Sequence, residues 1–301
     1  MSKLIEVKSI GKSFDSKQVL KNISFSVEEG SFYALLGENG AGKSTILRIL
    51  MGAETVDRGE ATMMGYDIYN APAKIKETIG YVSENINFEL PLTAAQVADH
   101  YQEFYPYFDM KMFTRLVKER RFDLNKKYQE YSRGQKMQFI LMLSLSIGPK
   151  LLLIDEVTSV LDIYARKYFM TLLHQFVQNG GTVIMTTNII AEIQNYATNL
   201  VMLKDGKVHI NSPIKDIPKF FIKIRKTKDR DHDIFNDREC YWAGENTDGS
   251  NSYIIPQYLK ARYQLTDEFY DRRTVQLDDI FIYFFNVTIE TETEDKNEKA
   301  A

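Results

Sequence analysis

Residues 37–45 read GENGAGKST and combine glycines with a lysine and two hydroxyl residues, a set of groups suited to binding phosphate. Glycines allow successive backbone N–H groups to converge on one anion, and a helix that follows adds the positive end of its dipole. We expect Lys43 to reach the β and γ phosphates of a nucleotide and the Ser44 hydroxyl to ligate magnesium. The candidate nucleotide-binding residues are Gly37, Glu38, Asn39, Gly40, Ala41, Gly42, Lys43, Ser44 and Thr45. The pattern indicates ATP or GTP binding; the alternative is a glycine turn with a surface lysine.

Two adjacent carboxylates, Asp155 and Glu156, follow the apolar run LLLI. Such a run predicts a strand that is buried on both faces of a parallel sheet. Ligands of open α/β sheets bind at the carboxyl ends of the strands. We therefore expect Asp155 to hold magnesium through a water molecule and Glu156 to polarise an attacking water. The alternative is a solvated strand end.

The segment YSRGQ, residues 131–135, precedes the strongly apolar run KMQFILMLSLSIG. Taken alone, Ser132 is typical of a helix N-cap whose hydroxyl accepts hydrogen bonds from amides of the first turn, and Gly134 relaxes the backbone. A hydroxyl and exposed amides at a helix start can also bind phosphate oxygens. The segment therefore has both a structural and a phosphate-binding interpretation.

The apolar pattern also indicates the elements that would position these groups. The runs FYALL and LLLI predict strands before the glycine-rich turn and before the two acids, and ILRILMG predicts a helix that closes at Gly52. Residues 84–131 are helical in pattern and rich in aromatic side chains, with a break at Pro106. The sequence LKDGKVHI predicts a hairpin with its turn at residues 205–206.

The three motifs stand in the order found in the ATP-binding-cassette (ABC) ATPases, which the chain resembles over roughly residues 3–212. The signature of that family is written LSGGQ; Ser132, Gly134 and Gln135 match it, and the first and third positions depart from it. The departing form YSRG resembles variants found among bacterial ABC-2 type exporters. The resemblance implies that the signature of one subunit covers the γ-phosphate of ATP held by another subunit. It therefore makes these three matching residues nucleotide-binding.

The resemblance implies an α/β fold of the P-loop NTPase class and ABC type, with a RecA-like core, an antiparallel β subdomain and a helical subdomain at about residues 85–145. The ATP-binding domain would span residues 1–213. Residues 214–288 alternate in short β-like runs before a final helix, LDDIFIYFF, and predict a small α+β C-terminal extension. The polar tail at 289–301 is expected to be disordered.

Four further assignments come from the resemblance alone. Phe14 lies where the family stacks an aromatic ring on adenine, although a hairpin core residue is an open alternative. Glu84 occupies the place of a glutamine that touches magnesium, and Asn188 the place of a histidine that contacts the γ-phosphate. Residues Ser159 to Asp162 match a segment that communicates across the dimer. A carboxylate can ligate magnesium, but an asparagine lacks the charge of an imidazolium, which puts the speed of hydrolysis in question.

Composition narrows the classes of function. A net charge of −3 gives no general attraction to nucleic acid or an anionic membrane, so no nucleic-acid partner is expected. The single cysteine excludes an internal disulfide, and the N-terminus lacks the pattern of a signal peptide. No apolar window reaches the roughly 18 to 20 residues of a membrane span. We therefore expect a cytoplasmic protein, peripheral on the inner face of the cell membrane, which it contacts through a partner chain.

The leading interpretation is an ATP-hydrolysing subunit of a bacterial ABC exporter that uses ATP and Mg²⁺. It would act as a homodimer or heterodimer of ATPase subunits on an ABC-type transmembrane subunit. One alternative, favoured by Glu84 and Asn188, is a nucleotide-gated regulatory ABC protein with weak hydrolysis. A soluble, non-transport ABC ATPase is the other, although such proteins usually carry two cassettes or a long coiled-coil insertion, and 301 residues accommodate neither. The sequence does not identify a cargo, because the membrane partner forms the path.

Overall fold

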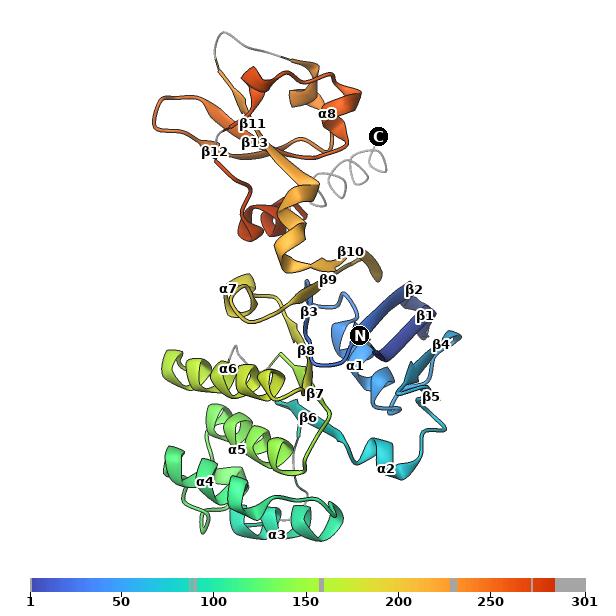
Figure 1. Cartoon of the computed structure of the whole chain (residues 1–301), viewed down its shortest axis with the longest axis vertical. Coiled ribbons are helices and arrows are strands. Elements are labelled where there is room, and N and C mark those ends of the chain that lie inside the picture. Colours follow the sequence, from blue (N-terminus) through green and yellow to red (C-terminus); the bar gives the residue numbers. More distant parts are fainter. Residues whose placement is uncertain are drawn as a thin grey trace. The chain divides into compact units, whose positions relative to one another are not determined.

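A computed structural model of the chain describes residues 2–86, 88, 91–156, 160–227, 232–271 and 273–284. The chain divides into two compact units, Met1–Asn211 (unit 1) and Ser212–Ala301 (unit 2), each of which is described separately below (Figure 1). The predicted disordered tail at 289–301 and Ser159 lie outside the described residues.

A six-stranded sheet forms the centre of unit 1 (Figure 1). Its strands, in spatial order, are β10 (Lys207–Pro213), β9 (Asn199–Lys204), β3 (Phe32–Gly37), β8 (Thr182–Thr187), β7 (Leu151–Asp155) and β6 (Ile79–Ser83). From β9 to β6 all neighbours are parallel. Strands β3, β7 and β8 are buried along their whole length, as expected of a parallel sheet covered on both faces. The strands predicted from FYALL and LLLI are therefore confirmed.

A second, antiparallel sheet of unit 1 lies beside the first helix of the chain. Its order is β2 (Lys17–Glu28), β1 (Lys3–Phe14), β4 (Arg58–Met63) and β5 (Tyr66–Asp67). One cluster of buried side chains joins β1 and β2 to α1 (Lys43–Leu50), β3 and β7. This shared core fixes α1, and with it the glycine-rich turn before it, against both sheets.

Unit 1 contains six further helices in its described residues. They are α2 (Ala73–Lys76), α3 (Ala94–Phe104), α4 (Met110–Arg120), α5 (Arg133–Ser146), α6 (Ile163–Gln178) and α7 (Ile190–Ile193), with a 3-10 turn at Tyr128–Glu130. Figure 1 shows α3, α4 and α5 grouped at one end of this unit, where α5 packs against β6 and α4. Residues 137–146 of α5 are all buried, which explains its nearly continuous apolar sequence. Pro106 lies between α3 and α4, at the predicted break.

The turn between β9 and β10 has Asp205 and Gly206 in left-handed conformations, with φ of 51° and 72°, which matches the predicted hairpin. Gly52 follows α1 with φ of 71° and ends that helix as predicted. No helix in the described part of the chain is both long enough and apolar enough to cross a membrane.

Unit 2 is built on a three-stranded antiparallel sheet in the order β11 (Phe221–Lys226), β13 (Asn251–Pro256) and β12 (Tyr241–Glu245). One cluster of buried side chains in this unit consists of Ile224, Ile234, Ile255, Leu259 and Leu265. Short helical segments surround the sheet: Ile214–Phe220, Asp233–Asn236, α8 (Leu259–Arg262), Asp267–Phe269 and residues 277–284. The runs FFIKIRK and SYIIP supply β11 and β13, and LDDIFIYFF supplies the last helical segment.

Candidate functional site

The glycine-rich turn between β3 and α1 closes around the side chain of Lys43. The Nζ atom of Lys43 donates hydrogen bonds to the carbonyl oxygens of Gly37, at 2.8 Å, and Glu38, at 2.9 Å. The residue is 3% exposed, and it is the first residue of α1. The turn therefore holds a buried ammonium at the amino end of a helix, which is an arrangement that favours bound anions.

Two of the glycines are required by packing. Gly42 has φ of 101°, and a Cβ atom there would lie 2.4 Å from Cδ2 of Leu20. At Gly37 a Cβ atom would lie 2.5 Å from the carbonyl oxygen of Leu203. A side chain at Gly37 would thus press on the backbone of β9, and one at Gly42 would be strained by its left-handed backbone and would press on the Leu20 side chain.

The side chains of Ser44 and Asp155 meet, although the two residues lie far apart in the sequence. The Ser44 hydroxyl donates to Oδ1 of Asp155 at 2.9 Å. Thr186 also donates to Oδ1, at 2.8 Å, and the Tyr81 hydroxyl donates to Oδ2 at 3.4 Å. Asp155 and Thr186 are paired neighbours in the parallel sheet, which places both side chains at its carboxyl edge. The result is a set of oxygen atoms around a largely buried carboxylate.

Glu156, the second acid, turns back toward the glycine-rich turn. Its backbone is left-handed, with φ of 48°, and its N–H donates to the Thr186 hydroxyl at 3.0 Å. Its Oε1 atom lies 2.8 Å from Nζ of Lys43, and its side chain is 41% exposed. A left-handed non-glycine residue is strained, and such strain concentrates at functional sites. Thr186 thus hydrogen-bonds to both acids, to the side chain of Asp155 and to the backbone of Glu156. Sequence reasoning did not predict this role.

A cavity of about 350 Å³ opens beside these groups. Its lining includes Asn39, Gly40, Gly42, Lys43, Ser44, Thr45 and Glu156, together with Phe14, Lys17, Val19 and Arg48. Phe14 is 36% exposed, which does not fit the alternative of a hairpin core residue. Arg48 stands one helical turn after Ser44, so its position could be inferred from the helix, whereas nothing in the sequence indicated Lys17.

The YSRGQ segment forms the predicted N-cap. Ser132 accepts a hydrogen bond from the backbone N–H of Gln135 at 3.2 Å, and the Gln135 side chain accepts from the N–H of Ser132 at 3.0 Å. This reciprocal capping box gives Gln135 a structural role that was not predicted. Gly134 packs closely, since a Cβ atom there would lie 3.1 Å from the carbonyl oxygen of Val160. The phosphate-binding interpretation of the segment stays a prediction.

Glu84 and Asn188, two further departures from the family pattern, lie at the same edge of the central sheet. Glu84 follows β6 and forms an ion pair with Arg133, the first residue of α5. This hydrogen-bonded partner raises the pKa of Arg133. Asn188 follows β8 directly and is exposed. The structure thus brings Lys43, Ser44, Asp155 and Glu156 together. The carboxylate of Glu84, which is predicted to bind magnesium, is paired with the guanidinium of Arg133.

Known proteins with similar sequences show the family of the chain. A family model described as ABC transporter matches residues 20–159. The ABC transporter ATP-binding protein YtrB of Bacillus subtilis is 30% identical over 229 residues, which cover 76% of this chain and 78% of YtrB. The chain belongs to the ABC transporter ATP-binding proteins. Another relative of this family, the Nod factor export ATP-binding protein I of Rhizobium meliloti, is 32% identical over 214 residues, covering 67% of this chain and 62% of that protein.

Solved structures of the family share the fold. An ATP-binding subunit of an ABC transporter superposes with a TM-score of 0.66 at 26% identity, covering 72% of this chain and 92% of that one. A bacterial ABC transporter cassette solved as a dimer gives a TM-score of 0.62 at 25% identity, covering 70% and 98%. The ABC-type P-loop NTPase fold predicted from the order of the motifs is confirmed. The chain is an ATP-binding and ATP-hydrolysing subunit of an ABC transporter.

Proposed function

We propose that this ATPase powers export of a cargo from a bacterial cell, acting from the cytoplasmic face of the membrane on separate transmembrane subunits. The observation that carries the proposal is the meeting of Lys43, Ser44, Asp155 and Glu156 beside one cavity. The direction of transport is supported by the name of a relative, the Nod factor export protein. The chain itself contributes nucleotide chemistry, and its partner forms the path.

Magnesium fits the oxygen atoms at the end of β7. Ser44 Oγ and Asp155 Oδ1 are hard ligands 2.9 Å apart, of the kind that Mg²⁺ prefers when water and nucleotide phosphate complete its octahedron. A bound magnesium ion would neutralise charge on the phosphate oxygens. Ser44 and Asp155 would hold it, and Thr186 would keep the Asp155 carboxylate oriented. Glu84 stays a predicted ligand whose carboxylate is engaged by Arg133.

Lys43 and Glu156 suggest an exchange of partners on nucleotide binding. An ammonium group has three N–H donors, and those of Lys43 face Gly37 O, Glu38 O and Glu156 Oε1. A phosphate oxygen must displace one of these, and the exposed Glu156 carboxylate is the one that phosphate repels. Glu156, once released, can orient and polarise the attacking water while its backbone stays fixed by Thr186. The Glu156 side chain would thus pair with Lys43 before the nucleotide binds and act as a base afterwards.

The start of α5 fits the role of a lid on a second subunit's nucleotide. Ser132, Arg133 and Gln135 are exposed, and the first turn of a helix presents N–H groups to anions. We therefore include in the proposal a head-to-tail dimer, homomeric or heteromeric, in which Ser132 and Gly134 contact the γ-phosphate held by the other subunit. A dimeric cassette among the related structures supports this arrangement.

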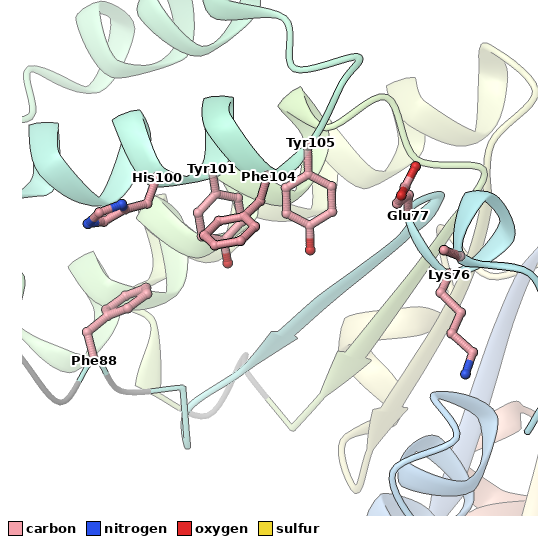
Figure 2. Close-up of a pocket in the computed structure, with 8 residues that line it drawn as sticks. Lys76, Glu77, Phe88, His100, Tyr101, Phe104 and Tyr105 are labelled. Atoms are coloured by element: carbon pink, nitrogen blue, oxygen red, sulfur yellow. The ribbon is translucent and has the colours of Figure 1, made fainter.

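A second cavity, of about 700 Å³, supports docking of the transmembrane partner. Figure 2 shows His100, Tyr101 and Phe104 of α3, together with Tyr105 directly after it, on the lining, opposite Phe88. Phe104 is 76% exposed and adjoins the other aromatic side chains of the lining, and a contiguous exposed apolar surface is typical of an interaction site. Burial raises the pKa of Tyr101 to about 12. We propose that an apolar helical segment of the transmembrane subunit occupies this cavity.

Turnover of the variant Glu156→Gln tests the catalytic part of the proposal. A carboxamide polarises water poorly, and loss of a positioned base typically costs 10²- to 10⁴-fold, so we expect at least about a tenfold loss of ATP hydrolysis. ATP should still bind, and dimers locked by ATP should accumulate on sizing with ATP and magnesium. A monomer with unaltered turnover would remove Glu156 from the mechanism.

Co-purification from membranes tests the docking part. Phe104→Ala should reduce recovery of the subunit with its membrane partner and leave ATP hydrolysis by the isolated subunit unchanged. The matched control is Tyr66→Ala, which removes another exposed aromatic ring, 44% accessible, on β5. Equal membrane recovery of the two variants would place the partner elsewhere.

A further inference from the structure

Glu84 and Arg133 form an ion pair between two segments that are far apart in the sequence, both within unit 1. Glu84 directly follows β6, whose last residue, Ser83, pairs with Asp155 in the parallel sheet. Arg133 is the first residue of α5 and follows the N-cap Ser132. The pair therefore links the edge of the sheet that carries the nucleotide site to the first turn of the signature helix.

The first turn of α5 is held from two directions. Arg133 reaches the residue after β6, and Gly134 packs so closely on the carbonyl of Val160 that a Cβ atom would lie 3.1 Å from it. Val160 belongs to the segment that follows β7 and Glu156. The turn thus contacts the segments that follow two neighbouring strands, and both of these segments begin at the candidate site.

The exposure of this ion pair indicates that it orients the start of α5 and adds little to folding stability. Its side chains are 36% exposed at Glu84 and 68% exposed at Arg133, and ion pairs this accessible contribute little to folding stability. The capping box already satisfies two amides of the helix start, those of Ser132 and Gln135, without either charge. What the pair adds is a lateral constraint, since it fixes where the turn lies relative to the end of β6.

We infer that Glu84 is a positioning residue that acts through Arg133, and that the two residues together orient the first turn of α5 for its contact with the γ-phosphate. The inference rests on the proposed function, in which that turn covers the nucleotide of a second subunit. Each of the two residues replaces a neutral residue of the family pattern. Glu84 introduces a negative charge and Arg133 a positive one, so the two substitutions complement each other. Loss of either partner should therefore impair the closed, hydrolytic state and leave nucleotide binding to the open subunit intact.

A double-mutant cycle on the full chain tests the inference by steady-state ATP hydrolysis. We expect Glu84→Gln and Arg133→Ala each to lower kcat about fivefold with KM for ATP changed less than about twofold, as for interactions made only on the way to the transition state. The double variant should lose no more than either single variant, because both remove one shared interaction. Arg133→Lys, which keeps the charge, should recover most of the activity.

Glu60→Gln is the matched control, because it removes an exposed ion pair with Lys8, at 3.2 Å, outside the site. It should behave as wild type. Losses that multiply in the double variant would overturn the inference, and so would wild-type kcat in Arg133→Ala, since Glu84 would then act alone, for example on the metal. Glu156→Gln, measured in parallel, separates the two levels of proposal: if it keeps full turnover, the proposed catalytic mechanism fails, whereas if only the Glu84 and Arg133 variants match wild type, the pair alone is wrong.

Discussion

Lys43 Nζ and Glu156 Oε1 lie 2.8 Å apart, so the cation of the glycine-rich turn and the carboxylate after β7 form an ion pair within one subunit. The lysine is 3% exposed, whereas the glutamate side chain is 41% exposed. The carboxylate can therefore leave for water at little cost, but the ammonium cannot. We therefore expect Glu156 to be the partner of Lys43 that is displaced when phosphate binds.

The first prediction concerns ATP affinity. Glu156→Gln should bind ATP at least as tightly as wild type, because the neutral amide competes weakly for Lys43 and does not repel phosphate. Lys43→Ala should bind about tenfold more weakly or worse, since a hydrogen bond to a charged group contributes about 1.5 to 3 kcal/mol. Equilibrium binding of a fluorescent ATP analogue measures both. If the glutamine variant also binds weakly, Glu156 supports the site instead of competing for it.

The second prediction separates the two roles of Ser132. Thr93 caps α3 through the same reciprocal box, with Gln96 as its partner, and so provides a matched control. Ser132→Ala and Thr93→Ala should each lower the free energy of unfolding by about 0.5 to 2 kcal/mol, the usual cost of a lost cap. Only Ser132→Ala should also lower kcat for ATP hydrolysis. Urea titration and steady-state turnover give the two readouts, and parallel kinetics in both variants would reduce YSRGQ to an N-cap.

The third prediction concerns alkaline stability. Burial raises the pKa of Tyr101 from its ordinary value of 10.0 to about 12. Between these values the unfolded chain has released the proton and the folded chain retains it, so the free energy of unfolding falls as pH rises through this window. Below about pH 10 the group is protonated in both states and has no such effect.

Tyr101→Phe cannot ionise, so its free energy of unfolding should fall less steeply than that of wild type between pH 10 and 12. Urea titrations at pH 8, 10 and 11 provide the comparison. Equal slopes for the two proteins would mean that Tyr101 ionises as readily in the folded chain as in the unfolded one.

Much of this site could be predicted from local sequence motifs. Near neighbours in the sequence define three of its parts: the turn at residues 37–45, the two acids and the N-cap Ser132. The types and spacing of these residues were enough to single them out. Contacts set by the register of the parallel sheet could not be read in the same way. Thr186 reaches both acids only because β7 and β8 pair as they do, and the pairing of Glu84 with Arg133 depends on how α5 packs on β6.

Unit 2 shows a different limit. The β-like runs at β11 and β13 were visible, but α8 and the 3-10 segments around them are too short to show helical periodicity. Helices of this length form only through tertiary packing, here on the core around Ile224 and Ile255. Only the packed structure therefore reveals them.

The last prediction concerns Asn188, the exposed residue that follows β8. The residue before it, Thr187, donates a hydrogen bond to the buried carboxylate of Glu192 at 2.9 Å and accepts one from Ile189 N–H at 3.0 Å. The backbone on both sides of Asn188 is thus fixed, which holds its amide at the carboxyl edge of the sheet. A neutral donor contributes about 0.5 to 1.5 kcal/mol, less than a charged imidazolium would.

Asn188→Ala should therefore lower kcat about three- to tenfold and leave ATP affinity unchanged, by the conversion of 1.36 kcal/mol per tenfold in rate. Asn179→Ala, which removes another exposed asparagine at the end of α6, is the control and should match wild type. Turnover at saturating ATP and magnesium should be compared across wild type, both alanine variants and Asn188→His. If Asn188→Ala equals wild type, the residue is a bystander. A large gain in Asn188→His instead identifies the native subunit as a slow motor, because a protonatable ring then supplies the charge that the amide lacks.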